Sequence, residues 1–178
     1  MNAFSAIWGE AAEESASPVF EAIFTARYEP VSRAIARIIH DSGRAEELAV
    51  DVFWKLLRNP RARGEHAGGW LHRTAVRLAL DELRRRARRE RYEKLMAWAG
   101  RPLQPDEIFS ALEEQGKVRS VLAGLAPRHA ELLLLRHGGA SYGELAGSLG
   151  IHEASVGQLL SRAQQAFRKE YVKRYGEQ

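Results

Sequence analysis

Residues 141–167 read SYGELAGSLGIHEASVGQLLSRAQQAF, and this stretch decides the fold of the C-terminal half. Ser141 followed three residues later by Glu144 is the pattern of a capping box, so a helix is expected to begin there. Gly150 supplies the left-handed residue that commonly ends a helix. Apolar residues then recur at helical spacing, at Val156, Leu159, Leu160, Ala163 and Phe167. The stretch therefore predicts two helices joined by a tight turn.

The two predicted helices carry the residue types that a helix-turn-helix requires. Ala146 is small enough for the point where steeply crossing helices touch, and Gly150 lies in the turn. Val156 and Leu159 are expected to lock the second helix against the first. An ordinary αα-hairpin would share part of this pattern, but it does not require all of these residues in register. The pattern favours a DNA-binding helix-turn-helix.

In such a motif the second helix enters the major groove of DNA with its outward residues. Gln158 is suited to adenine, and Arg162 is suited to guanine or to phosphate. Residues further along the helix are expected to touch the DNA backbone. The predicted contact residues are His152, Ser155, Gln158, Ser161, Arg162 and Lys169.

Helical spacing also predicts three helices in the N-terminal half. The first runs over 18–39, where Pro30 is expected to break or kink it. The second runs over about 44–58. The third begins near Gly69, after a loop over 59–69 that contains glycines, a proline and two arginines.

The third predicted helix is strongly basic. From Arg73 to Lys94 the chain has nine basic and four acidic residues, a net charge of +5, although the whole chain carries only +4. A basic stripe on a near-neutral protein is typical of a polyanion-binding surface. A solvated helix face would look similar, and charge alone does not separate the two.

Composition excludes several other classes of protein. The chain has no cysteine, which excludes disulfides and thiol catalysis and favours a reducing cytoplasm. No segment is long and apolar enough to span a bilayer, and the N-terminus has no signal-peptide pattern, so a soluble cytoplasmic protein without membrane insertion is expected. The six histidines are scattered, and no catalytic motif or metal-ligand spacing is present. We expect no enzymatic activity, no catalytic residues, no metal and no cofactor.

The predicted architecture is all-α, with two small helical domains joined by a flexible linker. The expected parts are a leader over 1–17, a first domain over 18–95, a linker over 96–106 and a second domain over 107–178. The leader is acidic, and its role and order stay undecided. The second domain is expected to hold four short helices, including the helix-turn-helix.

Four stretches together resemble the extracytoplasmic-function group of bacterial sigma factors, whose members hold the conserved sigma regions 2 and 4. AEELAVDVF at 45–53 is similar to the family's acidic polymerase-binding stretch. WLHRTAVRLALDELRR at 70–85 is similar to its promoter-melting and −10-reading segment. LAPRHAELLLLR at 125–136 precedes the helix-turn-helix, as it does in region 4. The resemblance covers residues 19–171.

This resemblance implies a sigma factor that directs RNA polymerase to promoters and starts DNA-templated transcription. Region 2 would bind core polymerase and would read and melt the −10 element, and region 4 would read the −35 element. The implied partners are the clamp helices of the largest polymerase subunit, the flap of the second-largest subunit and promoter DNA. An anti-sigma factor is a further candidate partner.

The resemblance also assigns residues to each role. The −35 role falls on the recognition-helix residues named above. The −10 and melting role falls on Arg61, Arg63, Trp70, Arg73, Arg77, Arg84, Arg85 and Arg88, with Glu65 and His66 as further candidates in the loop. Polymerase binding falls on Glu47, Val50, Asp51 and Trp54.

Two of the assigned tryptophans also have a purely structural interpretation. Trp54 shares an outward helix face with Glu47 and Asp51, which suits a docking surface, but it could instead pack under a neighbouring helix. Trp70, with cations one and two turns further on, suits the capture of unstacked bases. It would suit a place in the core equally well.

The chain departs from the family pattern at several positions. Arg77 stands where the melting helix usually has asparagine, and Val50-Asp51 stands where Gln-Glu is common. His152 replaces a Ser or Thr cap, and Gly157 and Leu159 stand where basic residues are frequent. The mid-helix glycine and the two missing cations, at Gly157 and Leu159, predict a weaker or unusual −35 interaction, or a region 4 that mostly binds partners.

Two alternatives from other classes stay open at the level of sequence. A stand-alone helix-turn-helix regulator would explain the C-terminal half and leave the basic helix without a role. A helical adaptor that sequesters another regulator would never touch DNA.

Overall fold

The computed structural model describes residues 18–98 and 110–176, and across these residues every regular element is a helix. The predicted leader and most of the predicted linker lie outside the described residues. The elements are α3 (Pro18–Ile39), α4 (Ser42–Leu57), the 3-10 turn η1 (Pro60–Ala62), α5 (Ala67–Trp98), α6 (Ser110–Gly124), α7 (Pro127–His137), α8 (Tyr142–Leu149) and α9 (Glu153–Tyr175). The predicted all-α fold is confirmed.

None of the helices in the described ranges is long and apolar enough to cross a membrane.

The sequence predicted a break or a kink at Pro30; helix α3 is continuous through this proline, so it does not break there. Pro30 lies on the exposed side, where water can serve the carbonyl that lacks an N–H partner. The opposite side buries Phe20, Phe24, Val31 and Ile35, which hold the helix to its neighbours. Packing along this face therefore outweighs the local cost of the proline.

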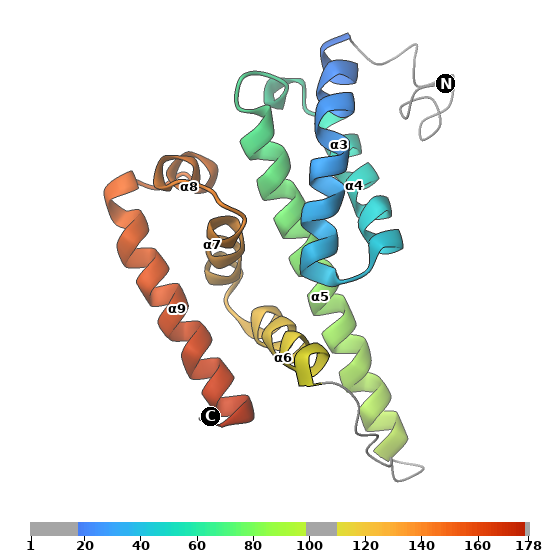
Figure 1. Cartoon of the computed structure of the whole chain (residues 1–178), viewed down its shortest axis with the longest axis vertical. Helices are drawn as coiled ribbons and strands as arrows, with labels where there is room; N and C mark the ends of the chain where they lie inside the picture. Colours follow the sequence, from blue (N-terminus) through green and yellow to red (C-terminus); the bar gives the residue numbers. More distant parts are fainter. Residues whose placement is uncertain (1–17, 99–109, 177–178) are drawn as a thin grey trace.

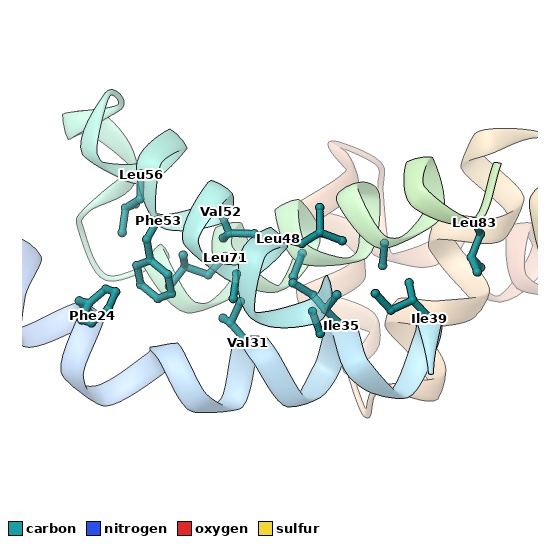
Figure 2. Close-up of a cluster of buried hydrophobic side chains, with 14 of the residues drawn as sticks. Phe24, Val31, Ile35, Ile39, Leu48, Val52, Phe53, Leu56, Leu71 and Leu83 are labelled. Carbon is teal, nitrogen blue, oxygen red and sulfur yellow. The ribbon is translucent and has the colours of Figure 1, made fainter. Parts of the chain in front are cut away.

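Helices α3, α4 and α5 share one hydrophobic core, which Figure 2 shows in close-up. Helix α4 begins at Ser42, where the side chain of Asp41 accepts a hydrogen bond from Arg44 N at 2.9 Å. Its predicted buried face is confirmed at Leu48, Val52, Phe53 and Leu56, whereas Leu57 is only half-buried. Aromatic rings close the core, with Phe24 and Phe53 edge to face at 4.9 Å between centroids.

The helix-turn-helix is formed as predicted. Ser141 Oγ accepts from Glu144 N at 3.2 Å, and the Glu144 carboxylate accepts from Ser141 N at 2.7 Å, which completes the capping box. Gly150 has φ 63°, in the left-handed region, and ends α8. Val156 and Leu160 are buried on the inner side of α9, while Leu159 is half-buried at the edge of the same core. Leu160 therefore takes the central locking position that the sequence pattern had assigned to Leu159.

Helix α5 lies between the two groups of helices (Figure 1). One side packs on α3 and α4, and the other side contacts α6, α7 and α8. Val76 and Leu80 of α5 are 1% and 2% exposed, and they belong to the core formed by the C-terminal helices. The first group of helices thus contributes two residues to the core of the second.

Candidate functional site

The predicted DNA-contacting residues of α9 lie on its surface. His152, Ser155, Gln158, Ser161, Arg162 and Lys169 are all exposed. Their neighbours Val156 and Leu160 face the core, so the exposed residues form the outer side of the helix. This is the side that a recognition helix presents to the major groove.

Few local interactions stabilise the first turns of α9. His152 is the N-cap residue, and its side chain makes no capping hydrogen bond. Gly157 follows one turn further on, where an added Cβ would meet only Tyr142 Cε2 at 3.7 Å. No close packing requires glycine at this position, although it costs helix stability.

The outer face of α4 brings together the residues assigned to polymerase binding. Glu47 and Asp51 are exposed and Val50 is half-buried. Trp54 is 40% exposed and belongs to neither hydrophobic core, with the Arg58 guanidinium 5.5 Å from its ring centroid. A large, partly exposed aromatic ring flanked by acids is suited to protein docking.

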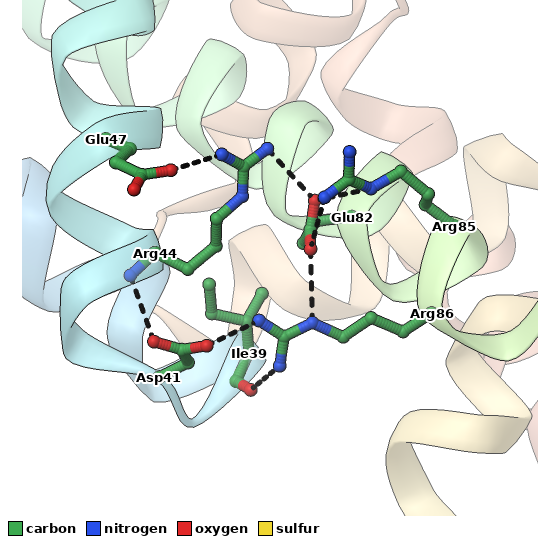
Figure 3. A network of polar contacts seen from close by, with 7 residues as sticks. All are labelled: Ile39, Asp41, Arg44, Glu47, Glu82, Arg85 and Arg86. Atoms are coloured by element: carbon green, nitrogen blue, oxygen red, sulfur yellow. Dashed lines mark hydrogen bonds and ion pairs between the residues drawn. The ribbon is translucent and has the colours of Figure 1, made fainter. Parts of the chain in front are cut away.

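A network of charged side chains ties this face of α4 to α5 (Figure 3). Glu82 on α5 is 6% exposed and accepts from Arg86 Nε at 3.1 Å and from Arg44 Nη2 at 3.3 Å. Arg44 also donates to Glu47. Arg86 continues to the α3–α4 turn, where it donates to Asp41 Oδ2 at 2.7 Å. The network joins the end of α3 and the start of α4 to the middle of α5.

Two carboxyl groups of this network have lowered pKa values. Burial raises the pKa of Glu82, but the hydrogen bond from Arg86 and the charge of Arg44 outweigh it, so the pKa lies below its ordinary value. Hydrogen bonds from Arg44 N and from the Arg86 side chain lower the pKa of Asp41. Both groups are therefore held in the charged form.

The loop before α5 contains residues with different surroundings. Arg61 is exposed, as are Glu65 and His66. Arg63 is half-buried, and its guanidinium donates to the carbonyls of Leu56 and Leu57 at the end of α4. Arg63 thus supplies hydrogen bonds to the last turn of α4, a structural role that its place in the sequence does not indicate.

Trp70 and Thr74 lie on the first turns of α5. Trp70 is half-buried against the core of α3, α4 and α5, which supports its interpretation as a core residue. Thr74 Oγ1 donates to Trp70 O at 2.8 Å within the helix.

Arg73 and Arg77 both pair with an acid of another helix, although the Arg77 side chain stays 52% exposed. Each donates through Nε to Oε1 of Glu131 on α7, at 2.9 Å and 2.8 Å. The Glu131 side chain is 6% exposed. No role had been assigned to Glu131, yet it is the sole acid in the apolar run 130–135, and that isolation is the signal that could have singled it out.

Further along α5, the arginines differ in their partners. Arg84 Nη1 bonds Asp81 at 3.3 Å, and Arg85 bonds Glu82 at 3.3 Å. Arg88 is exposed and forms no ion pair within the described part of the chain. Of these three cations, Arg88 is the one most available to a phosphate.

A groove of about 600 Å³ opens where α3, α5, α7 and α8 meet. His72 lines it, and its ring is close enough to Gly138 that an added Cβ there would lie 2.9 Å away. The pKa of His72 lies below its ordinary value, because burial lowers it more than the charge of Glu144 on α8 raises it. The charged and titratable residues around the groove are Arg27, Arg37, Glu65, His72, His137 and Glu144.

An exposed second helix of a helix-turn-helix, a basic helix and a helix face with exposed acids beside Trp54 are features expected of a DNA-binding transcription protein that also binds a protein partner. Comparison with protein families is consistent with this class. Residues 23–89 match the model of sigma-70 region 2, and residues 115–166 match that of sigma-70 region 4. The chain belongs to the sigma-70 family, in its extracytoplasmic-function group.

Individual relatives are distant but cover most of the chain. One is the ECF RNA polymerase sigma factor SigE of Mycolicibacterium smegmatis, 25% identical over 97% of this chain and 69% of the relative. The ferric citrate uptake sigma factor FecI of Escherichia coli is 28% identical over 90% of this chain and 96% of its own length. The probable ECF RNA polymerase sigma factor SigI of Mycobacterium tuberculosis is 29% identical over 71% of this chain and 47% of its own length.

The chain is accordingly a sigma factor, which directs RNA polymerase to promoters and starts DNA-templated transcription. Sigma factors as a class are not enzymes. Core RNA polymerase and promoter DNA are the partners that this family membership implies. The hypotheses of a stand-alone regulator and of an adaptor gave the N-terminal helices no role. The match of residues 23–89 to sigma-70 region 2 assigns them one.

Proposed function

We propose that the three surfaces described above divide the work of promoter recognition. The outer face of α4 docks on the clamp helices of the largest polymerase subunit. Helix α5 and the loop before it contact the −10 element and its melted strand, and the exposed side of α9 contacts the −35 element. Residues 18–95 act as region 2 and residues 107–178 as region 4, with 96–106 as the linker and 1–17 as a leader.

The observation that carries this proposal is the position of Trp54. Trp54 is 40% exposed and shares the outer face of α4 with two exposed acids, Glu47 and Asp51. Large aromatic side chains dominate the binding energy of protein interfaces, and nearby acids fix the orientation of a basic partner. Docking of α4 on polymerase explains all three residues together.

Each DNA-facing surface has its own support. On α5, Arg88 is exposed and without an ion-pair partner among the described residues, and Arg84 and Arg85 lie next to it. On α9 the exposed polar residues begin at the first turn, where a recognition helix reads bases. The missing side-chain cap at His152 and the glycine at 157 favour a weak −35 contact.

The partners follow from the same division. The flap of the second-largest polymerase subunit would receive the α6–α9 domain, and the chain would act in the cytoplasm, where the polymerase is found. The chain itself would catalyse no reaction and hold no cofactor. An anti-sigma factor is a further partner that membership of this family allows.

A binding assay with core polymerase tests the docking face. Replacing Trp54 with Ala should weaken binding to core polymerase by more than about tenfold, because a central aromatic residue commonly supplies 2 kcal/mol or more. Promoter-dependent transcription should fall in parallel. The control is Glu29→Ala, which removes an exposed acid of α3 whose partner Arg33 is 3.9 Å away. Equal binding by the two variants would exclude α4 as the docking face.

A further inference from the structure

Three arginines share the buried carboxylate of Glu82 (Figure 3). Arg86 Nε donates to Oε1 at 3.1 Å, and Arg44 Nη2 donates to Oε2 at 3.3 Å. Arg85 completes the set, with Nη2 at 3.4 Å from Oε1 and Nε at 3.3 Å from Oε2. One acid therefore receives guanidinium groups from two helices, α4 and α5.

Two of these three arginines have a second acidic partner. Arg44 also donates to Glu47 on its own helix. Arg86 also donates to Asp41 Oδ2 at 2.7 Å, at the turn between α3 and α4. The second contacts restrain both guanidinium groups, so the Glu82 carboxylate that lies between them has little freedom to move.

Arg85 is the member of this group that reaches the surface. Its side chain is 63% exposed, against 28% for Arg44 and 34% for Arg86. Across residues 18–98 and 110–176, Glu82 is the acid with which Arg85 pairs. The edge of the guanidinium formed by Nε and Nη2 faces this carboxylate. Nη1 and the second N–H of Nη2 are left for another acceptor.

This geometry suits an arginine that binds a phosphate group. A guanidinium is planar and carries five N–H donors, so a carboxylate can hold one edge while the other edge receives two phosphate oxygens. Glu82 does not cancel the charge of Arg85, because two further arginines share the same carboxylate. Without that acid the three cations would repel one another, and Arg85 would have no partner to orient it.

We propose that Glu82 is a positioning residue for promoter binding: it holds one edge of the Arg85 guanidinium and directs the free edge to a backbone phosphate of the −10 element. The proposal rests on the −10 role proposed above for Arg85. Glu82 is buried and acts through Arg85, without touching DNA itself. An unrestrained side chain lowers affinity when binding immobilises it, so loss of Glu82 should weaken promoter binding about three- to tenfold.

A double-mutant cycle tests this role. Glu82→Gln keeps the shape of the side chain and removes its charge, and Arg85→Ala removes the group through which Glu82 acts. Polymerase holoenzyme is reconstituted with each full-length variant, purified by gel filtration and titrated with a labelled promoter duplex. Each single variant should bind the promoter more weakly than wild type, Glu82→Gln by about three- to tenfold. In the Arg85→Ala background, Glu82→Gln should cause no further loss.

The matched control is Asp81→Asn, which removes an acid one residue earlier on α5. Asp81 pairs with Arg84 at 3.3 Å, and its side chain is 69% exposed. Removal of a negative charge from a DNA-binding helix should leave promoter affinity unchanged or raise it slightly. A loss that Glu82→Gln shows and Asp81→Asn does not show therefore cannot come from the change in charge alone.

Two results of the cycle would overturn the positioning role alone. In the first, Arg85→Ala weakens promoter binding but Glu82→Gln binds as tightly as wild type, or more tightly. In the second, Glu82→Gln causes the same loss in both backgrounds, which would show a general effect on the fold. If instead Arg85→Ala binds like wild type, the proposed −10 role of Arg85 fails, and the positioning role falls with it.

A substitution at the surface keeps the test independent of the stability of Glu82→Gln. Arg85→Lys preserves the charge but removes the planar fork that engages a carboxylate and a phosphate at once. It should weaken promoter binding by at least about threefold, because a lysine cannot be held side-on by Glu82. Arg89→Lys is the control, since the Arg89 side chain is 79% exposed and pairs only with Glu93 in the described part of the chain. Promoter binding by Arg85→Lys that equals wild type would contradict the proposal, because charge alone would then be enough.

Discussion

Arg86 Nη2 lies 2.7 Å from Oδ2 of Asp41, although 45 residues separate the two in the sequence. The contact joins the middle of α5 to the residue that caps α4. The same guanidinium donates to Glu82 and to Ile39 O, at 3.1 Å and 3.3 Å. One side chain therefore holds the α3–α4 turn against α5.

Replacing Arg86 with Ala should destabilise the protein by about 1–2 kcal/mol, because hydrogen bonds to charged groups are lost and Glu82 stays buried with fewer partners. Urea unfolding followed by circular dichroism measures the change. Arg89→Ala is the matched control, since Arg89 pairs with Glu93 at 3.8 Å and both side chains are mostly exposed. The control should stay within about 0.5 kcal/mol of wild type. The same loss in both variants would show that the network does not stabilise the fold.

Stability should fall in mild acid, and Glu82 should be one cause. Its pKa is lower in the folded protein than in the unfolded chain, so the folded state binds fewer protons. The stability that it contributes is present above the unfolded value of about 4.3 and is lost as the pH falls through the lower folded value. The Glu82→Gln variant should be less stable than wild type at neutral pH. It should also lose less stability than wild type between about pH 5 and about pH 3, the range in which a glutamate titrates. Parallel curves for the two proteins would rule out this role.

The glycine at 157 should be replaceable at a gain in stability. Gly157→Ala should stabilise the protein by up to about 1 kcal/mol, because alanine is the better helix former and its Cβ finds only an ordinary contact with Tyr142. Thermal unfolding checks the sign. Gly150→Ala is the opposite case, since φ 63° strains any residue with a Cβ. That variant should lose about 1 kcal/mol. Destabilisation by both substitutions would mean that Gly157 has a packing role.

The salt dependence of promoter binding should distinguish the arginines of α5. Each phosphate neutralised contributes about 0.9 to the slope of log K against log salt concentration on duplex DNA. Arg88→Ala should therefore reduce the slope by about 0.9. Arg84→Ala should change it less, because Asp81 already pairs with that guanidinium. The measurement uses polymerase holoenzyme on a promoter duplex. An unchanged slope after replacement of Arg84, Arg85 and Arg88 together would remove these residues from the DNA contact.

The sequence was most informative where a local motif determines geometry. The capping box at Ser141 and the left-handed residue Gly150 require only nearby residues, so both could be predicted and both are confirmed. The buried face of α4 followed from its periodicity in the same way. The continuity of α3 through Pro30 could not be predicted, because it depends on packing against α4 and α5.

The candidate sites could be predicted only in part. Exposure of the recognition-helix residues follows from the helical period. By contrast, the hydrogen bonds of Arg63 to the end of α4 and the contact of Arg73 with Glu131 depend on how helices meet. No spacing rule reaches across the 58 residues between Arg73 and Glu131. The roles of individual residues in binding DNA and polymerase stay predictions.

The burial of Val76 and Leu80 affects how the two halves of this chain would behave as separate fragments. Both lie in a core formed mostly by the C-terminal helices, with Ile38 of α3 packed against it, so a fragment that ends after α5 would present more of these two aliphatic side chains to water beside a row of cations. The complementary fragment would expose the apolar residues of α6 and α7 that had covered them. Exposed apolar patches of this kind favour self-association. Each half of the protein therefore covers apolar residues of the other half and helps to keep it soluble.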